Sequence, residues 1–289
     1  MGSVPPDDWD GEVGAGGGRR TLPRYHLGRM SDHTTTTSSA PPGGVAPHPI
    51  LVEHYAEPDA RKPYLTDLFD SSAQHYDWIN TVLSFGTGVR YRRQALLRAG
   101  LEPGMQMLDV ACGTGVISEI GASIVGPAGT VTSVDPSQGM REQARERRGI
   151  EAIAGAAESL PLDDASIDFL VMGYALRHVT DLETAFAEYA RVLRPGGRLL
   201  LLEITSPESR LRKAAVRFYF RSLIPAIMRI GSRDKKAHEL MVYHWDSIEQ
   251  CVRPEVIIDA LGATGFDGID RHVEVGMFSE YTARRPETK

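Results

Sequence analysis

The spacing of apolar residues switches repeatedly along this chain between two periods. From residue 105 onward, short apolar runs that are typical of buried strands alternate with stretches in which apolar residues recur every three or four positions. The predicted strands are Met105–Val110, Thr130–Asp135, Ala152–Ala154, Ile167–Gly173 and Arg198–Ile204, and the helices between them are Ser118–Val125, Ser137–Arg148 and Leu182–Leu193. This alternation predicts an α/β fold with a doubly wound, parallel sheet.

The pattern differs on both sides of this region. Upstream, Tyr64–Leu83 and Tyr91–Leu97 have helical spacing. Downstream, a predicted helix Pro254–Leu261 is followed by the runs Asp267–Val275 and Met277–Ala283, which are too close together for a crossover helix. We therefore expect these two runs to pair as an antiparallel hairpin, which completes a seven-stranded, mostly parallel sheet.

Residues 1–60 differ in composition from the rest of the chain. They contain stretches such as Gly14–Gly18 and Thr34–Ser39 and few branched apolar residues. Such a segment buries too little apolar surface to offset the entropy lost on ordering, so we predict a disordered tail over residues 1–60 and a folded domain over residues 61–289. Translation from Met30 is as compatible with this pattern as translation from Met1.

The segment Glu208–Glu239 interrupts the alternation of strands and helices. It places apolar residues among arginines and lysines at helical spacing. Two interpretations stay open: an amphipathic helix that covers the sheet edge, and a lid over an apolar substrate whose basic face contacts a membrane surface.

Charge and cysteine content exclude several classes of protein. The net charge of −6 gives no general attraction to nucleic acid. The two cysteines, Cys112 and Cys251, lie far apart and argue against a disulfide framework or a cysteine zinc site, and we predict no bound metal. No apolar run approaches the roughly 18 residues needed to span a bilayer. We expect a cytoplasmic protein, with peripheral membrane contact and a homodimer as open alternatives.

The segment Leu108–Gly115 is the strongest sign of a ligand site. It joins a predicted strand to a predicted helix through Gly113 and Gly115, and the acidic Asp135 ends the next strand. A glycine turn at a helix N-terminus, followed by a carboxylate for ribose hydroxyls, is typical of a nucleoside cofactor site. A dinucleotide fingerprint would need a third glycine where this chain has Ser118.

Asp109 favours a different nucleoside. An acid four residues before the first glycine suits a ligand with positive charge, such as the sulfonium and amino groups of S-adenosylmethionine. The pattern Asp-x-x-x-Gly-x-Gly is similar to that of class I methyltransferases, which share a Rossmann-like fold. A dinucleotide, or a strand-turn-helix without ligand, remains a weaker alternative.

Several longer segments resemble the UbiE/Coq5 family, whose members C-methylate the ring of ubiquinone and menaquinone precursors. The similar segments are Tyr76–Gly86, Leu108–Gly115, Val134–Met140, Ala157–Leu162, Tyr174–Asp181, Arg191–Gly197 and Phe218–Pro225, and the resemblance covers about residues 63–285. The chain departs from the family pattern at His178, where Asn is usual, at Gly88-Val89, at Ala156 and near Phe278. The cofactor half is therefore kept, and the acceptor half is altered.

The resemblance implies an S-adenosylmethionine-dependent methyltransferase that C-methylates a prenylated quinol-type ring, an apolar small-molecule acceptor. A methyltransferase for another phenolic, lipid or polyketide-like small molecule is the alternative, and a non-catalytic cofactor-binding module is a weaker one. The expected cofactor contacts are Asp109, Ala111, Gly113, Gly115, Asp135, Pro136, Met140, Ala157 and Glu158, with Asp135 on the ribose and Glu158 at the adenine edge.

The candidate catalytic residues follow the fourth strand, where ligands gather in doubly wound sheets. They are Tyr174, Arg177 and His178. Arg177 would hold the acceptor oxygen as an anion or act through a water, although a simple ion pair with Asp181 is the competing interpretation. His178 would act as a base at neutral pH, or would be only a capping or surface group. Acceptor contacts are expected from Tyr76, Asn80 and Tyr219.

Overall fold

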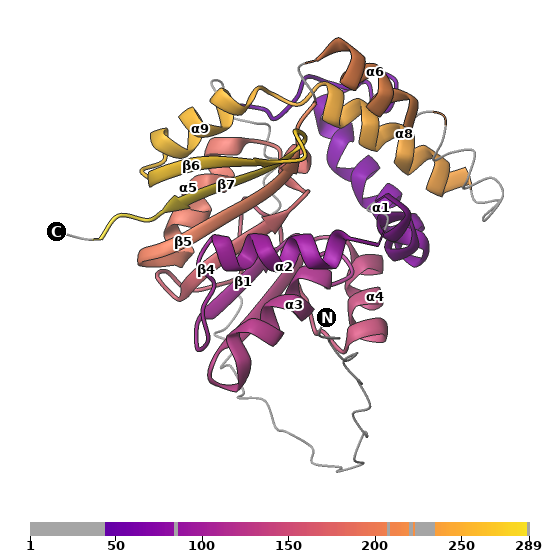
Figure 1. The fold of residues 1–289 in the computed structure, drawn as a ribbon. Coiled ribbons are helices and arrows are strands. Elements are labelled where there is room, and N and C mark those ends of the chain that lie inside the picture. Colours follow the sequence, from indigo (N-terminus) through magenta and orange to yellow (C-terminus); the bar gives the residue numbers. More distant parts are fainter. Residues whose placement is uncertain (1–43, 84–85, 207–208, 220–221, 223–234, 288–289) are drawn as a thin grey trace, which may run out of the picture. The chain divides into compact units, whose positions relative to one another are not determined.

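A single mixed sheet organises the part of the chain that the computed structural model describes, which is residues 44–83, 86–206, 209–219, 222 and 235–287 (Figure 1). Its seven strands lie in the order β3-β2-β1-β4-β5-β7-β6. The strands are β1 (Gln106–Val110), β2 (Thr130–Asp135), β3 (Ile153–Ala154), β4 (Ile167–Gly173), β5 (Leu193–Ile204), β6 (Asp267–Glu274) and β7 (Phe278–Arg284). The α-helices in the described residues are α1 (Pro58–Leu83), α2 (Gly88–Arg98), α3 (Val116–Val125), α4 (Gln138–Arg148), α5 (Leu182–Val192), α6 (Arg210–Phe218), α8 (Lys235–Glu249) and α9 (Pro254–Ala263), with short 3-10 helices η1 (Gly126–Ala128) and η2 (Leu176–His178).

The strand directions confirm the predicted fold class. The pairs β1–β2, β1–β4, β2–β3 and β4–β5 are parallel, whereas β7 pairs antiparallel with both β5 and β6. The β6–β7 turn passes through Val275 and Gly276 at positive φ, 53° and 72°, which is how so short a link reverses the chain. The sheet is therefore mostly parallel and ends in the expected hairpin.

Alternate residues of the central strands enter two separate cores. Met107 and Phe169 pack with α2 and α3 on one face, and Leu108 and Leu170 pack with α5 and α9 on the other. Because successive side chains of a strand point to opposite faces, strands covered on both sides read as continuous apolar runs. This is why the sequence showed these strands clearly.

One predicted boundary is wrong. The tail was expected to end at residue 60, but Leu51 and Tyr55 are buried against α1 and α8, and the backbone of Val45 accepts a hydrogen bond from Leu182. A few apolar residues suffice here because they fill a gap between helices that are distant in sequence. Residues 1–43 lie outside the described part of the chain.

Helices α1, α6 and α8 lie at the end of the sheet where β1, β4 and β5 end (Figure 1). Helix α1 contacts both α4 and α8. Of the predicted amphipathic segment 208–239, the structure describes α6 and the start of α8, and the rest falls outside the described residues. Helix α8 as a whole was not predicted, and it supplies His244 to the site.

Candidate active site

The loop after β1 has a backbone shape that suits close approach of a ligand. Ala111, Gly113 and Gly115 all have positive φ, at 54°, 57° and 85°, and α3 begins immediately afterwards at Val116. At Gly115 the φ of 85° is what favours glycine, since a Cβ there would meet only the flexible end of the Ile150 side chain. The turn leaves the first N–H groups of α3 available to a ligand.

Asp109 is fully buried at the end of β1. Its Oδ2 accepts a hydrogen bond from the Ser118 hydroxyl at 2.6 Å, and Ser118 in turn accepts one from Ser133 at 2.8 Å. Its Oδ1 is buried without a hydrogen-bond partner. Burial raises the pKa of Asp109 to about 7. Ser118, which breaks the dinucleotide fingerprint, thus has a role of its own as a partner of this carboxyl group.

Asp135 lies at the end of β2 and faces the same loop. Its Oδ2 accepts from the Gly113 N–H at 2.7 Å, and its Oδ1 accepts from the Ser137 N–H at 2.9 Å. Burial raises its pKa to about 6. Each oxygen keeps a lone pair for a ribose hydroxyl. Of the neighbouring candidates, Met140 is buried and Pro136 is exposed.

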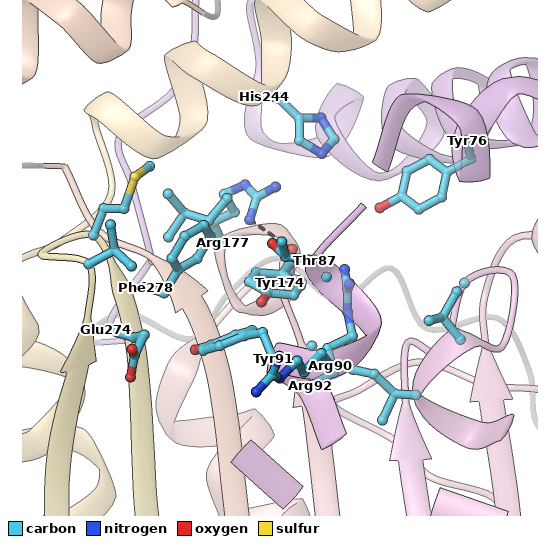
Figure 2. A pocket seen from close by; sticks show the side chains of 18 of the residues that line it. Tyr76, Thr87, Arg90, Tyr91, Arg92, Tyr174, Arg177, His244, Glu274 and Phe278 are labelled. Carbon is cyan, nitrogen blue, oxygen red and sulfur yellow. Dashed lines mark hydrogen bonds between the residues drawn. The ribbon is translucent and has the colours of Figure 1, made fainter. Parts of the chain in front are cut away.

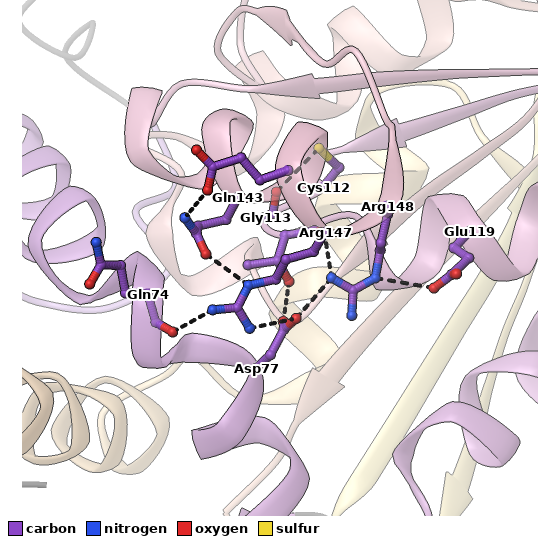
Figure 3. A network of polar contacts seen from close by, with 10 residues as sticks. Gln74, Asp77, Cys112, Gly113, Glu119, Gln143, Arg147 and Arg148 are labelled. Carbon is purple, nitrogen blue, oxygen red and sulfur yellow. Dashed lines mark hydrogen bonds and ion pairs between the residues drawn. The ribbon is translucent and has the colours of Figure 1, made fainter.

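Helix α1 is joined to this cofactor half by polar contacts (Figure 3). Asp77 accepts from the Thr114 hydroxyl in the glycine loop, and it pairs with Arg148 of α4 at 2.8 Å. About two turns earlier on α1, Asp70 accepts from the N–H of Gly139 in the first turn of α4 at 2.9 Å. The sequence pointed to the Tyr76–Gly86 segment, but only as acceptor contacts. The structure shows that Asp77 in it anchors the glycine loop.

Ala157 and Glu158 lie beside the cofactor half, after β3. Ala157 is partly buried against the main core, and Glu158 accepts a hydrogen bond from the Thr180 N–H. Neither residue lines the cavity described next. Their contact with an adenine ring stays a prediction.

A cavity of about 660 Å³ connects the glycine loop to an apolar chamber (Figure 2). This volume is in the range of small-molecule sites. Its floor is the loop Ala111–Thr114 together with Gly173 and Tyr174 at the end of β4. The apolar wall comes from α6 and the β6–β7 hairpin: Ala215, Val216, Tyr219, Val275, Met277 and Phe278.

Arg177 is buried at the polar end of this cavity. Its Nη1 donates to Glu203 Oε1 at 2.6 Å and to the Tyr174 carbonyl at 2.7 Å, and its Nε donates to Ser247 Oγ at 3.1 Å. The expected alternative, an ion pair with Asp181, is wrong. Asp181 instead caps α5 by accepting from the Thr184 N–H at 2.7 Å, because the chain turns into that helix and points Arg177 toward β5.

The two histidines near Arg177 differ in position. His178 does not line the cavity, and its Nδ1 lies 3.0 Å from the Tyr243 hydroxyl. Burial lowers its pKa well below the usual value. His244 of α8 does line the cavity, and its ring lies 6.1 Å from that of His178. The geometry therefore favours His244, to which the sequence drew little attention, over His178 as the histidine that meets a ligand.

The sequence offers no pattern that singles out His244. From Leu240 to Ile248 every residue except Val242 is buried, so α8 has no one-sided buried stripe that would place His244 toward the sheet. The predicted amphipathic segment ends at Glu239, just before these residues.

The predicted aromatic contacts meet at the cavity. Tyr174 has a positive φ of 62°, Arg92 lies 5.0 Å above its ring, and burial raises its pKa to about 12. Tyr76 covers the glycine loop, and Tyr219 lies on the apolar wall. The side chain of Asn80 lies outside the described residues.

These features fit S-adenosylmethionine. A buried carboxyl oxygen without a partner on Asp109, a glycine cradle and the paired oxygens of Asp135 are what an amino-bearing, ribose-containing cation requires. No pyrophosphate is needed to explain them. The fold and the site together define an S-adenosylmethionine-dependent methyltransferase of class I.

Comparison with known proteins identifies the family. Residues 57–279 match the model of the ubiE/COQ5 methyltransferase family, and the chain belongs to that family. It is 34% identical over 231 residues to the ubiquinone/menaquinone biosynthesis C-methyltransferase UbiE of Campylobacter jejuni, covering 76% of this chain and 97% of the relative. It is 36% identical over 177 residues to the demethylmenaquinone methyltransferase of Symbiobacterium thermophilum, covering 59% of this chain and 70% of the relative.

Solved structures share the fold at lower identity. A possible histamine N-methyltransferase from Thermotoga maritima superimposes with a TM-score of 0.54 at 21% identity, over 76% of this chain and 98% of that one. Phosphoethanolamine N-methyltransferase 2 of Haemonchus contortus, solved with S-adenosyl-L-methionine, gives 0.54 at 17% identity over 75% and 57% of the two chains. These similarities confirm the class I methyltransferase fold.

Proposed function

We propose that this enzyme transfers a methyl group from S-adenosylmethionine to a ring carbon of a prenylated quinol. The observation that carries the proposal is the single cavity that joins the glycine loop to an apolar chamber with a polar end at Arg177. Such a chamber suits an aromatic ring whose hydroxyl meets the polar end. The names of the curated relatives, which act in quinone biosynthesis, support this class of acceptor.

The chemistry asks little of the protein beyond alignment and charge. S-adenosylmethionine, when bound at the glycine loop, supplies a methyl group on a positively charged sulfur. The ring carbon next to a quinol hydroxyl would form the new bond to the methyl group while the methyl–sulfur bond breaks and S-adenosylhomocysteine leaves. That carbon would then lose one proton to solvent, which restores aromaticity. Side chains that hold the hydroxyl and exclude water accelerate such a step by fixing the reacting atoms.

Arg177 is the residue that we propose holds the acceptor oxygen. Its Nη1 and Nε are occupied by Glu203, Tyr174 and Ser247, and within the described residues its Nη2 makes no hydrogen bond. A guanidinium fixed on one side and open on the other is preorganised to stabilise negative charge that develops on the oxygen. Glu203 keeps the group in place.

The experiment uses the purified full chain with methyl-labelled S-adenosylmethionine and a short-chain demethylated naphthoquinol kept reduced with dithionite. We expect label on a ring carbon, as located by mass spectrometry. The double variant Arg177→Met with Glu203→Gln removes both charges together and should lower turnover by about 100-fold while keeping affinity for S-adenosylhomocysteine. Transfer to the oxygen or nitrogen of another phenolic or lipid acceptor, with none to the quinol, would refute the acceptor class.

Helix α6 supports the expectation of peripheral membrane contact. Leu211 and Phe218 lie on one side of the helix with exposed fractions of 81% and 63%. Arg210 lies beside this side, Arg217 pairs with Glu249 of α8, and Val216 lines the cavity on another side. An exposed apolar face with a cation next to it, beside a cavity mouth, suits an anionic bilayer from which a prenyl tail enters. Among the described residues no helix is long and apolar enough to cross a membrane. A homodimer remains a prediction.

A further inference from the structure

The polar end of the cavity combines a hydrogen-bond donor with a hydrogen-bond acceptor. Arg177 can only donate, and His244 lines the same cavity. Ser247 connects the two, because it accepts from Arg177 Nε at 3.1 Å and donates to the backbone carbonyl of His244 at 3.0 Å. Figure 2 shows both side chains in the cavity lining, drawn from different elements, η2 and α8.

The structure fixes the protonation of His244. Its Nδ1 lies 3.1 Å from the Leu240 carbonyl oxygen, which can only accept, so Nδ1 carries the hydrogen. Burial and the charge of Arg177 lower the pKa of His244 to about 3, so the ring stays neutral at physiological pH. Its Nε2 is therefore a lone-pair acceptor, and no residue in the described part of the chain bonds to it.

From this geometry we infer that His244 Nε2 makes the site select the reduced form of its acceptor, by accepting a hydrogen bond from the ring hydroxyl. The inference rests on the proposed function. A quinol hydroxyl accepts from Arg177 and donates to His244 at once. The carbonyl of the oxidised quinone accepts from Arg177 but leaves Nε2 facing a second acceptor with no proton between them.

Such a mismatch discriminates strongly between the quinol and the quinone. A buried acceptor left without a donor loses its hydrogen bond to water and gains none, and sites that hydrogen-bond a substrate hydroxyl reject analogues that lack it. His178 cannot perform this selection, since its Nδ1 already meets the Tyr243 hydroxyl and its ring does not line the cavity. The selection therefore acts on binding, before any methyl transfer.

The test measures binding by calorimetry, with the full chain saturated with S-adenosylhomocysteine. The probe is a short-chain demethylated naphthoquinone, titrated once in air and once reduced with dithionite. For the wild type we expect the quinol to bind more tightly than the quinone by roughly tenfold or more. His244→Leu should bring this ratio close to one, mainly through weaker quinol binding, with affinity for S-adenosylhomocysteine unchanged.

Tyr243→Phe is the matched control, because it changes the neighbouring ring on α8 without touching the cavity lining. We expect it to keep the wild-type ratio. Equal affinities for the two redox forms in the wild type, an unchanged ratio in His244→Leu, or an equal collapse in Tyr243→Phe would each overturn the inference. Failure of both redox forms to bind would instead refute the proposed acceptor class, and with it this inference.

Discussion

Replacing Asp109 with asparagine should change how the stability of the ligand-free protein depends on pH. The carboxyl group is fully buried, one oxygen has no partner, and burial raises its pKa from 3.8 to about 7. The native state therefore holds this proton at pH values where the unfolded state has lost it. Because the unfolded state then binds fewer protons, the free energy of unfolding falls as pH rises through this window.

The size of this change in stability follows from the pKa shift of Asp109. Stability falls by about 1.4 kcal/mol for each pH unit between the two pKa values, which is about 3 kcal/mol between pH 5 and pH 8. In Asp109→Asn the amide oxygen can still accept from Ser118, but its NH₂ group replaces the oxygen that has no partner. This substitution costs about 1–3 kcal/mol at every pH and adds no ionisation.

Urea unfolding at pH 5, 6, 7 and 8 measures the free energy of unfolding of the wild type and of Asp109→Asn. The stability of Asp109→Asn relative to the wild type should improve by about 3 kcal/mol from pH 5 to pH 8. Taking the difference cancels contributions of opposite sign, such as that of His48, whose pKa burial lowers to about 4. Parallel curves for the two proteins would refute the reasoning, since they would mean that Asp109 is ionised throughout.

Three further outcomes are expected. Glu203→Gln leaves a buried guanidinium without its counter-ion and should lower the free energy of unfolding by about 3–5 kcal/mol, as measured by chemical denaturation; a loss below 1 kcal/mol would contradict a buried pair. Leu211→Ser with Phe218→Ser should weaken sedimentation with anionic vesicles several-fold at constant S-adenosylhomocysteine affinity, and undiminished binding would exclude α6 as the contact. Deleting residues 1–43 should leave the melting temperature nearly unchanged, whereas a deletion that also removes the buried Leu51 should lower it by several degrees.

The cofactor half could be predicted because its signal is local. The glycine loop, its preceding acid and Asp135 are set by a strand, a turn and the next strand within thirty residues. Positive φ values, a helix N-terminus and a buried carboxylate follow from that order alone. The role of Ser118 could not be predicted, because a hydroxyl that bonds a buried carboxyl group on the preceding strand leaves no mark in the apolar pattern.

The acceptor half could not be predicted to the same depth because it is assembled from distant segments. Arg177 pairs with Glu203 on the next strand, and Ser247 reaches it from a helix seventy positions away. Competition between Asp181 and Glu203 as partners is decided by the direction in which η2 leaves β4. Spacing along the chain favoured the nearer acid, and the fold brought the farther one into contact.

This division of the site separates substitutions that affect binding of the methyl donor from substitutions that affect the choice of acceptor. Asp77 and Asp70 anchor the cofactor loops to α1 through bonds to Thr114 and Gly139, and none of these bonds involves α6 or α8. The cavity lining that we propose for the acceptor comes from α6, α8 and the hairpin instead. A substitution on those elements can therefore alter which ring is accepted while the methyl donor stays in place. The side chain of the altered His178, which in the described residues hydrogen-bonds only Tyr243 of α8, lies on that acceptor side.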